Sequence, residues 1–126
     1  MSERLPSVGM VIALASRLPA VAALVCAGSV ALAAYASHAA TPILRERLWL
    51  ASGFALLHAI GLLALSSRSS LLASIGKISM MAGIALFSGS LAAAALWSTP
   101  TGAAPLGGML LIAGWLLMAA DFLRRP

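Results

Sequence analysis

The chain has 126 residues, of which 62% are hydrophobic and only 9% are charged, and its mean hydropathy is +1.05. Soluble domains carry about 25% charged and about 45–50% apolar residues, so this chain has too little polar surface to coat a water-soluble globule. Disorder is excluded as well, because disordered segments combine low hydrophobicity with high charge. The composition therefore predicts a protein whose solvent is a lipid bilayer.

The net charge of +5 comes from eight lysines and arginines against three acids. These basic residues occur singly or in pairs between apolar runs, without the basic stripe and interleaved aromatics of a nucleic-acid binder. No nucleic-acid partner is predicted, and the charges are read as topology determinants. The single cysteine, Cys26, permits neither an intramolecular disulfide nor a cysteine-based metal site.

The spans follow from three stretches, 18–44, 48–67 and 78–120, that lack Asp, Glu, Lys and Arg. About 20 apolar residues cross a hydrocarbon core, so the first two stretches hold one span each. The third holds two, because the turn cluster Ser98–Pro105 contains two prolines and a glycine.

Backbone polar groups in lipid must be satisfied within the spanning structure, and the strict alternation of a barrel strand is absent, so the spans are helices. The sequence predicts an all-α fold, an integral membrane four-helix bundle. It forms one domain over residues 1–126, with spans at roughly Leu18–Ala36, Trp49–Leu65, Ile75–Trp97 and Leu106–Phe122.

Orientation follows from the distribution of basic residues. Arg45 and Arg47 lie on one side of the four spans, and six basic residues lie on the other: Arg4, Arg17, Arg68, Lys77, Arg124 and Arg125. The excess predicts a multi-pass membrane protein with both termini in the cytoplasm. The amphipathic segment Ile43–Leu50 is expected to lie along the outer surface before the second span begins.

His58 is the most unusual residue, because it falls about 15 Å into the second span at 1.5 Å per residue. An ionisable group at the midplane is a functional hypothesis by default. The structural alternative is a neutral imidazole that hydrogen-bonds across helices, with Ser88 or Ser90 as partner. His38 is expected near the outer interface. Because the two histidines lie at different depths, no metal and no cofactor is predicted.

Two stripes of small residues, Ala23/Ala27/Ala31 and Ala85/Gly89/Ala93, recur every four residues. Such spacing lets helix backbones approach closely and predicts a tight bundle. Gly107 and Gly108 open the last span after a proline and also permit close packing.

Two residues of the last span have separate interpretations. Trp115 falls in mid-span and is expected to pack between helices. Asp121 lies one turn from the end of the span and is interpreted as an interfacial acid that is paired with or screened by Arg124 and Arg125.

Four patterns occur in order along the chain: Ala34-Tyr-Ala-Ser-His38, Trp49 to His58 with Ala-Ile-Gly-Leu-Leu after it, Ala82-Gly-Ile-Ala-Leu-Phe-Ser-Gly-Ser-Leu91, and Pro105-Leu-Gly-Gly with Gly114-Trp115. Together they resemble the domain of unknown function 423 family, which includes small bacterial inner-membrane proteins and the eukaryotic transmembrane protein 256 group. The resemblance spans roughly residues 20–120. It implies a four-helix protein of the bacterial cytoplasmic (inner) membrane and supplies no activity.

The family's motif residues fall on His38, His58, Ser88, Gly89, Ser90, Gly107, Gly108 and Trp115 in this chain. The chain departs from the usual family pattern before His38, where glycines are replaced, and at Ala92, where a tyrosine is usual. The resemblance therefore implies no role here that rests on those glycines or on that tyrosine.

No nucleophile–base pair, carboxylate pair or phosphate-binding loop is evident, so an enzyme is not predicted. The favoured function is a non-enzymatic bundle that associates with itself or serves as an accessory subunit of a larger membrane complex. The alternative is a small oligomeric transporter or channel with a polar midplane around His58. A His58 in a wet cavity favours transport, and a His58 in a dry interface favours a structural role.

Overall fold

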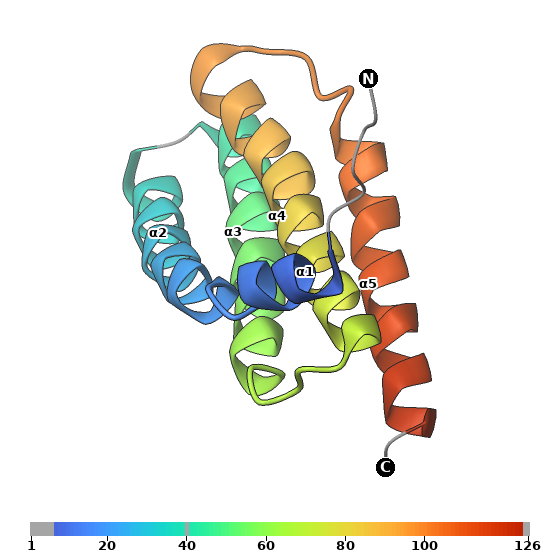
Figure 1. Cartoon of the computed structure of the whole chain (residues 1–126). Coiled ribbons are helices and arrows are strands. Elements are labelled where there is room, and N and C mark those ends of the chain that lie inside the picture. The colour runs from blue at the N-terminus through green and yellow to red at the C-terminus, as the bar shows by residue number, and fades with distance from the viewer. Residues whose placement is uncertain (1–6, 40, 125–126) are drawn as a thin grey trace.

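The structure, a computed structural model, describes residues 7–39 and 41–124. The helices in this part of the chain are α1 (Val8–Ala15), α2 (Leu18–Ala39), α3 (Pro42–Ala64), α4 (Leu71–Trp97) and α5 (Ala104–Arg124), as Figure 1 shows. Within the described residues, four helical stretches are long and apolar enough to cross a bilayer: 8–38, 42–64, 71–97 and 104–124. The all-α fold with four spans is therefore confirmed.

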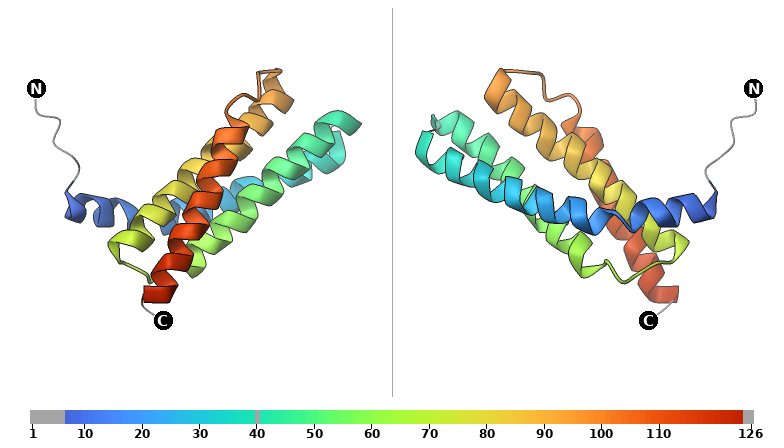
Figure 2. Two further views of the ribbon diagram at one scale, coloured as in Figure 1. Left: turned by 90° about the vertical axis from the view of Figure 1, so that its right-hand side faces the viewer. Right: turned by 60° about the vertical axis from the view of Figure 1, so that its left-hand side comes forward.

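The four long helices form two antiparallel pairs. α2 packs against α3, α4 packs against α5, and α3 joins the pairs through its contact with α4. The two pairs cross at an angle, which is clearest in the side views of Figure 2. The connection between α3 and α4 lies at the same end of the bundle as the end of α5 (Figure 1).

The short helix α1 is not predicted from the sequence. Pro19 explains why it ends where it does: proline lacks the N–H that would bond the Ala15 carbonyl, and its ring clashes with that carbonyl in a continuous helix. The chain instead makes a tight turn, in which the Arg17 N–H bonds the Leu14 carbonyl at 3.1 Å. The turn changes the direction of the chain, and α1 then lies across α4 (Figure 1).

The boundaries of the other helices follow local rules. The Ser70 side chain caps α4 by accepting a hydrogen bond from the Ala73 N–H at 3.0 Å. Ser98 ends α4 in the left-handed conformation, with φ 56°. Thr41 precedes α3 as its N-cap and Pro42 is its first residue, where the missing N–H of proline costs nothing. The expected surface segment Ile43–Leu50 is therefore wrong: these residues form the first turns of α3.

The buried core lies between the helix pairs and is filled by small and flexible side chains. Ala59 and Leu62 of α3 meet Met80 of α4 and Leu111 and Met118 of α5. A second cluster, Ala36, Leu48 and Ala95, closes the other end of α2, α3 and α4. Leucines on the outside, among them Leu24, Leu57 and Leu116, are more than three-fifths exposed. Apolar side chains that face outward on helices of this length are expected to contact lipid acyl chains.

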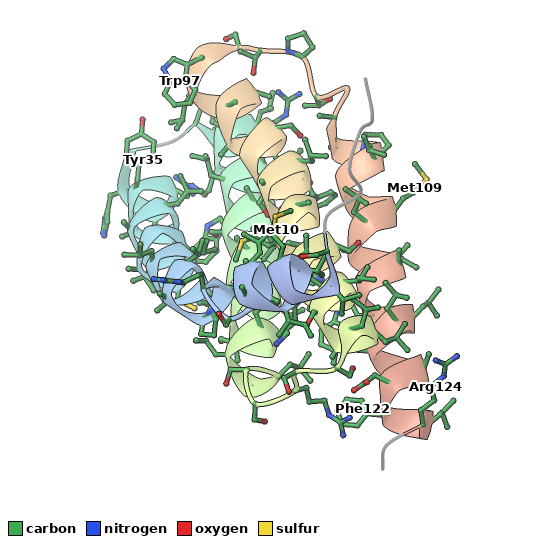
Figure 3. The ribbon with its side chains drawn as sticks, in the orientation of Figure 1. Met10, Tyr35, Trp97, Met109, Phe122 and Arg124 are labelled. Carbon is green, nitrogen blue, oxygen red and sulfur yellow. The ribbon has the colours of Figure 1, made fainter. Side chains whose placement is uncertain are left out.

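The two ends of the bundle differ in their polar side chains (Figure 3). Tyr35 and Trp97 lie at one end, on α2 and α4, and both are exposed. Phe122 and Arg124 lie at the opposite end, on the last turn of α5. Exposed aromatic side chains near helix ends are typical of the membrane–water interface. Of the residues used to predict the orientation, Arg4 and Arg125 lie outside the described residues.

Candidate functional site

His58 is buried, with 6% of its surface exposed. Its Nδ1 lies 2.7 Å from the Phe54 carbonyl oxygen, one turn earlier in α3, so Nδ1 carries the proton of this hydrogen bond. The imidazole stacks on the Phe54 ring at a centroid distance of 5.8 Å and faces Trp115 of α5 at 6.2 Å. The predicted partners Ser88 and Ser90 are therefore wrong, because the backbone of α3 itself offers a carbonyl within reach.

The depth of His58 also changes. α3 begins at Pro42 rather than near Trp49, so it has about two further turns at its start. His58 then lies about 9 Å from the end of α3 at Ala64, at 1.5 Å per residue. It is closer to the α3–α4 connection than to the start of α3. The rings of Phe54 and Trp115 give it an aromatic, apolar environment.

Ser88, Gly89 and Ser90 point in different directions around α4. Ser88 is 6% exposed, and its hydroxyl has no hydrogen-bond partner among the described residues. The Ser90 hydroxyl bonds the Phe87 carbonyl of its own helix at 3.2 Å. Gly89 faces outward, and a Cβ added there would meet nothing within 4 Å. These three family-motif residues therefore do not form one site.

The remaining residues that the sequence singles out lie at separate positions in the structure. His38 is exposed near the end of α2. Gly107 lies against the backbone of α4, where a Cβ would come 2.8 Å from the Phe87 Cα and closer still to its nitrogen. Gly108 has more room, because a Cβ added there would lie 3.8 Å from the nearest atom of the Phe87 ring. Trp115 contacts α3 through one ring edge, which would be 3.1 Å from a Cβ at Gly61, and 42% of its surface is exposed.

α4 and α5 approach each other through glycines that the sequence does not mark as a set. A Cβ at Gly83 would lie 2.9 Å from the Gly107 carbonyl oxygen, and one at Gly114 would lie 2.9 Å from the Gly76 carbonyl oxygen. Two glycines on each helix, two turns apart, thus remove the side chains that would separate the backbones. We call these four residues the α4–α5 glycine contact.

Both predicted small-residue stripes lie elsewhere. The α2 stripe (Ala23, Ala27 and Ala31) is exposed along its whole length. In the α4 stripe, Ala85 and Gly89 are exposed and Ala93 is partly exposed. The prediction that these stripes pack the bundle together is therefore wrong for contacts within one chain. The helical spacing is right, but the sequence does not tell which small residues face a neighbouring helix of the same chain.

A buried polar cluster lies at the end of the bundle, and the sequence does not predict it. Asp121 of α5 is 3% exposed and forms an ion pair with Arg68 of the α3–α4 connection, with 2.7 Å between Nη1 and Oδ2. The Ser70 hydroxyl donates to the other carboxylate oxygen. The Arg68 guanidinium lies 3.6 Å from the centre of the Phe122 ring, a favourable cation–π contact. This cluster fastens the start of α4 to the end of α5.

The interpretation of Asp121 as an interfacial acid is corrected for Arg124, whereas Arg125 lies outside the described residues. The Asp121 carboxylate is buried against the α3–α4 connection and pairs with Arg68, whereas Arg124 is exposed. The physical reason is that α5 brings the Asp121 carboxylate within reach of Arg68 and Ser70. Asp121 lies on the buried face with Met118, and Arg124 lies beyond it on the last turn.

Lys77 extends the cluster from inside α4, where it is 2% exposed. Its ammonium group donates to the Arg68 carbonyl oxygen at 2.6 Å. The long aliphatic stem lets the charge reach back to the helix end. One signal could have revealed this cluster: Lys77 and Asp121 are ionisable residues one or two turns inside helices that end on the same side, and such residues need partners.

Among the described residues, no group of three His, Cys, Asp or Glu side chains is placed to hold a metal ion. One family model, described as "Protein of unknown function (DUF423)", matches residues 32–108. The match covers α3 and α4 completely, together with the end of α2 and the start of α5. Neither a curated protein nor a solved structure matches the chain.

Proposed function

The chain belongs to the DUF423 family of proteins of unknown function, and we propose that it is a non-enzymatic membrane helix bundle that associates with further copies of itself or with a larger membrane complex. Its place would be the bacterial cytoplasmic membrane, with both termini on the cytoplasmic side. The proposal rests on the chain's own residues, because the family supplies no activity.

One observation carries the proposal: small residues with helix-packing spacing face away from the molecule. Ala27 lies at the centre of the exposed α2 stripe, and Gly89 lies at the centre of the α4 stripe with nothing within 4 Å of its Cβ position. Lipid tails are as apolar as leucine, so helices associate in membranes chiefly where small residues allow close backbone contact. Both stripes therefore remain available to a helix of another molecule.

The transport alternative is supported less well by the geometry. It needs a polar, water-accessible site around His58. His58 instead donates to a backbone carbonyl of its own helix and packs against Phe54 and Trp115. A polar atom that a transport site could still use is the buried Ser88 hydroxyl, which has no hydrogen-bond partner among the described residues.

Association in liposomes tests the proposal. Donor- and acceptor-labelled protein is reconstituted at falling protein-to-lipid ratios, and energy transfer is followed. For the unchanged protein, we expect energy transfer to persist on dilution. The Ala27→Leu variant should associate about tenfold more weakly, which corresponds to a loss of about 1.4 kcal/mol of association free energy. Ala113→Leu, an equally small exposed site on α5, is the control and should behave as the unchanged protein. Transfer that falls to the level of random mixing at every ratio contradicts self-association.

A further inference from the structure

The helix α1 is not needed to cross the membrane. α2 has 22 residues, and at 1.5 Å per residue it rises about 33 Å, enough for a hydrocarbon core of about 30 Å. α1 instead lies across α4 (Figure 1), where the two helices are in contact. It carries no charged residue, so it adds apolar surface to this side of the bundle.

The crossing of α1 over α4 leaves a groove of about 310 Å³ between them. Five apolar residues line the groove: Met10, Val11, Leu14, Ile75 and Ile78. Met10, Leu14 and Ile75 are exposed at its edge, and Figure 3 shows Met10 in front of α4. Since this lining is purely apolar, water gains no hydrogen bonds there.

The level of the groove along α4 matches the start of the acyl chains. α4 has 27 residues and rises about 40 Å, about 10 Å more than the hydrocarbon core. Roughly the first turn of α4 therefore lies in the headgroup region. Ile75 is about 6 Å beyond Leu71 at 1.5 Å per residue, which places the groove where the headgroups give way to hydrocarbon.

A cation follows the groove lining by one turn of the chain. Arg17 is exposed and follows Leu14, one of the lining residues, by a single tight turn closed by the 3.1 Å bond from the Arg17 N–H to the Leu14 carbonyl. Side chains that are three residues apart in such a turn project on the same side. The Arg17 side chain has no hydrogen bond or ion pair with another residue of the part that the structure describes.

We propose that the α1–α4 groove holds one acyl chain of an anionic phospholipid, with the phosphate of the lipid paired to Arg17. The apolar lining takes the chain and the guanidinium takes the phosphate, which it binds well because its planar donors match phosphate oxygens. This site goes beyond the proposed association, because it uses neither small-residue stripe.

A transmembrane helix of a partner fits this groove less well. Such a helix is about 10 Å wide with its side chains. α1 crosses α4 at Ile75 and Ile78 and so blocks a helix from lying along α4 at that level. An acyl chain is thin and flexible enough to pass beneath α1. The lipid would also fix α1 against α4 and give this short helix a function.

The test uses the full chain in nanodiscs that contain a trace of phosphatidylglycerol with a photoactivatable diazirine in one acyl chain, in a background of unlabelled phosphatidylglycerol and phosphatidylethanolamine. After illumination, labelled positions are mapped by peptide mass spectrometry. We expect label to concentrate on 10–14 and 75–78. Removing one interfacial arginine weakens anionic-lipid binding by about 1 kcal/mol, or about fivefold, so Arg17→Gln should lower this labelling about fivefold.

Two controls make the result decisive. Arg124→Gln removes another exposed cation, from the last turn of α5, and should leave the labelling of 10–14 and 75–78 unchanged. Ile75→Trp, which fills the groove, should abolish that labelling, whereas Ile112→Trp on the outside of α5 should not.

Three results would overturn the inference. The first is label spread evenly over all outward-facing helices. The second is equal labelling by a photoactivatable phosphatidylethanolamine, which points to any acyl chain without a phosphate contact to an anionic lipid. The third is an absence of label from 10–14 and 75–78 while other outward-facing segments are labelled, which would show that no acyl chain enters the groove.

Discussion

The two faces of α4 carry similar residues and have different surroundings. On the inner face, Gly76 and Gly83 lie so close to α5 that an added Cβ would come 3.2 and 2.9 Å from backbone carbonyl oxygens. On the outer face, Gly89 has nothing within 4 Å of its Cβ position. A small residue in a membrane helix thus marks a possible backbone contact, and only a facing helix shows whether that contact is made within the chain.

The difference also shows what holds the bundle together. The inner face combines the α4–α5 glycine contact with the polar cluster of Arg68, Ser70 and Asp121 at the end of the pair. The outer face has neither of these contacts. Within one molecule, the surroundings of Gly89 on this face are expected to be lipid. Substitutions on the two faces should therefore have very different costs, with the largest at the polar cluster and the smallest on the outer face.

Loss of the Asp121 carboxylate should cost most. Asp121→Ala leaves Arg68 and Lys77 together without the acid that faces them, and breaking a buried ion pair costs about 3 kcal/mol or more. We take the lower end of that range because the Arg68 side chain is 23% exposed. Reversible unfolding in mixed micelles by increasing SDS measures the free energy. Arg124→Ala is the control, and a loss equal to that of the control contradicts a buried cluster.

A methyl group on the inner face should cost about 2 kcal/mol. Gly107→Ala places a Cβ against the backbone of Phe87, whereas Gly108→Ala, one residue later, meets nothing closer than 3.8 Å. Overpacking typically costs about 1–3 kcal/mol, and the helix propensity gained from alanine is the same in both variants. The same SDS titration separates them. Equal stability of the pair would show that α4 and α5 are not in backbone contact here.

His58 should behave as a packing residue. His58→Ala removes the ring that lies between Phe54 and Trp115 and should cost about 2–3 kcal/mol through the cavity that it leaves. His58→Phe keeps an aromatic ring and loses one hydrogen bond, worth about 1 kcal/mol. Unfolding midpoints of the two variants give the difference. If phenylalanine proves as costly as alanine, the imidazole does more than fill space.

The outer face should tolerate a large side chain. Gly89→Leu is expected to change the stability of the monomer by no more than about 0.5 kcal/mol, as for other exposed positions. Energy transfer between labelled molecules in liposomes should nevertheless fall, because the leucine separates helices of neighbouring molecules. A strongly destabilised monomer would place Gly89 on the inner face and remove the contrast between the two faces.

The span pattern can be predicted because it depends on lengths and charge-free runs. The turn cluster 98–105 divides the longest run correctly. The direction of α1 cannot be predicted in the same way. The apolar run before Arg17 does not show that the chain turns there, and Pro19 is also typical of the first turn of an ordinary helix. α3 begins earlier than predicted, because the charges of Arg45, Glu46 and Arg47 indicate an amphipathic surface segment before the span, whereas the helix already starts at Pro42.

The polar contacts are the least predictable part of the molecule. The pairing of Arg68 with Asp121 joins residues that are 53 positions apart. An acid inside a helix signals that a partner is needed, but nothing local in the sequence shows that the partner is Arg68. For His58 the nearest acceptor is a carbonyl in its own helix, which any helix offers and no motif records. The glycines can be recognised one by one, but those that face α5 and those that face outward have the same apolar neighbours in the sequence.

The central claim is that the small-residue stripes contact other molecules, and cysteine cross-linking in native membranes tests it most directly. In a Cys26→Ala background, Ala27→Cys on α2 and Ala113→Cys on α5 place thiols at two exposed sites of the same residue type. We expect a cross-linked pair of chains for Ala27→Cys and none for Ala113→Cys at the same expression level. Equal cross-linking at both sites, or none at Ala27→Cys, would contradict the claim.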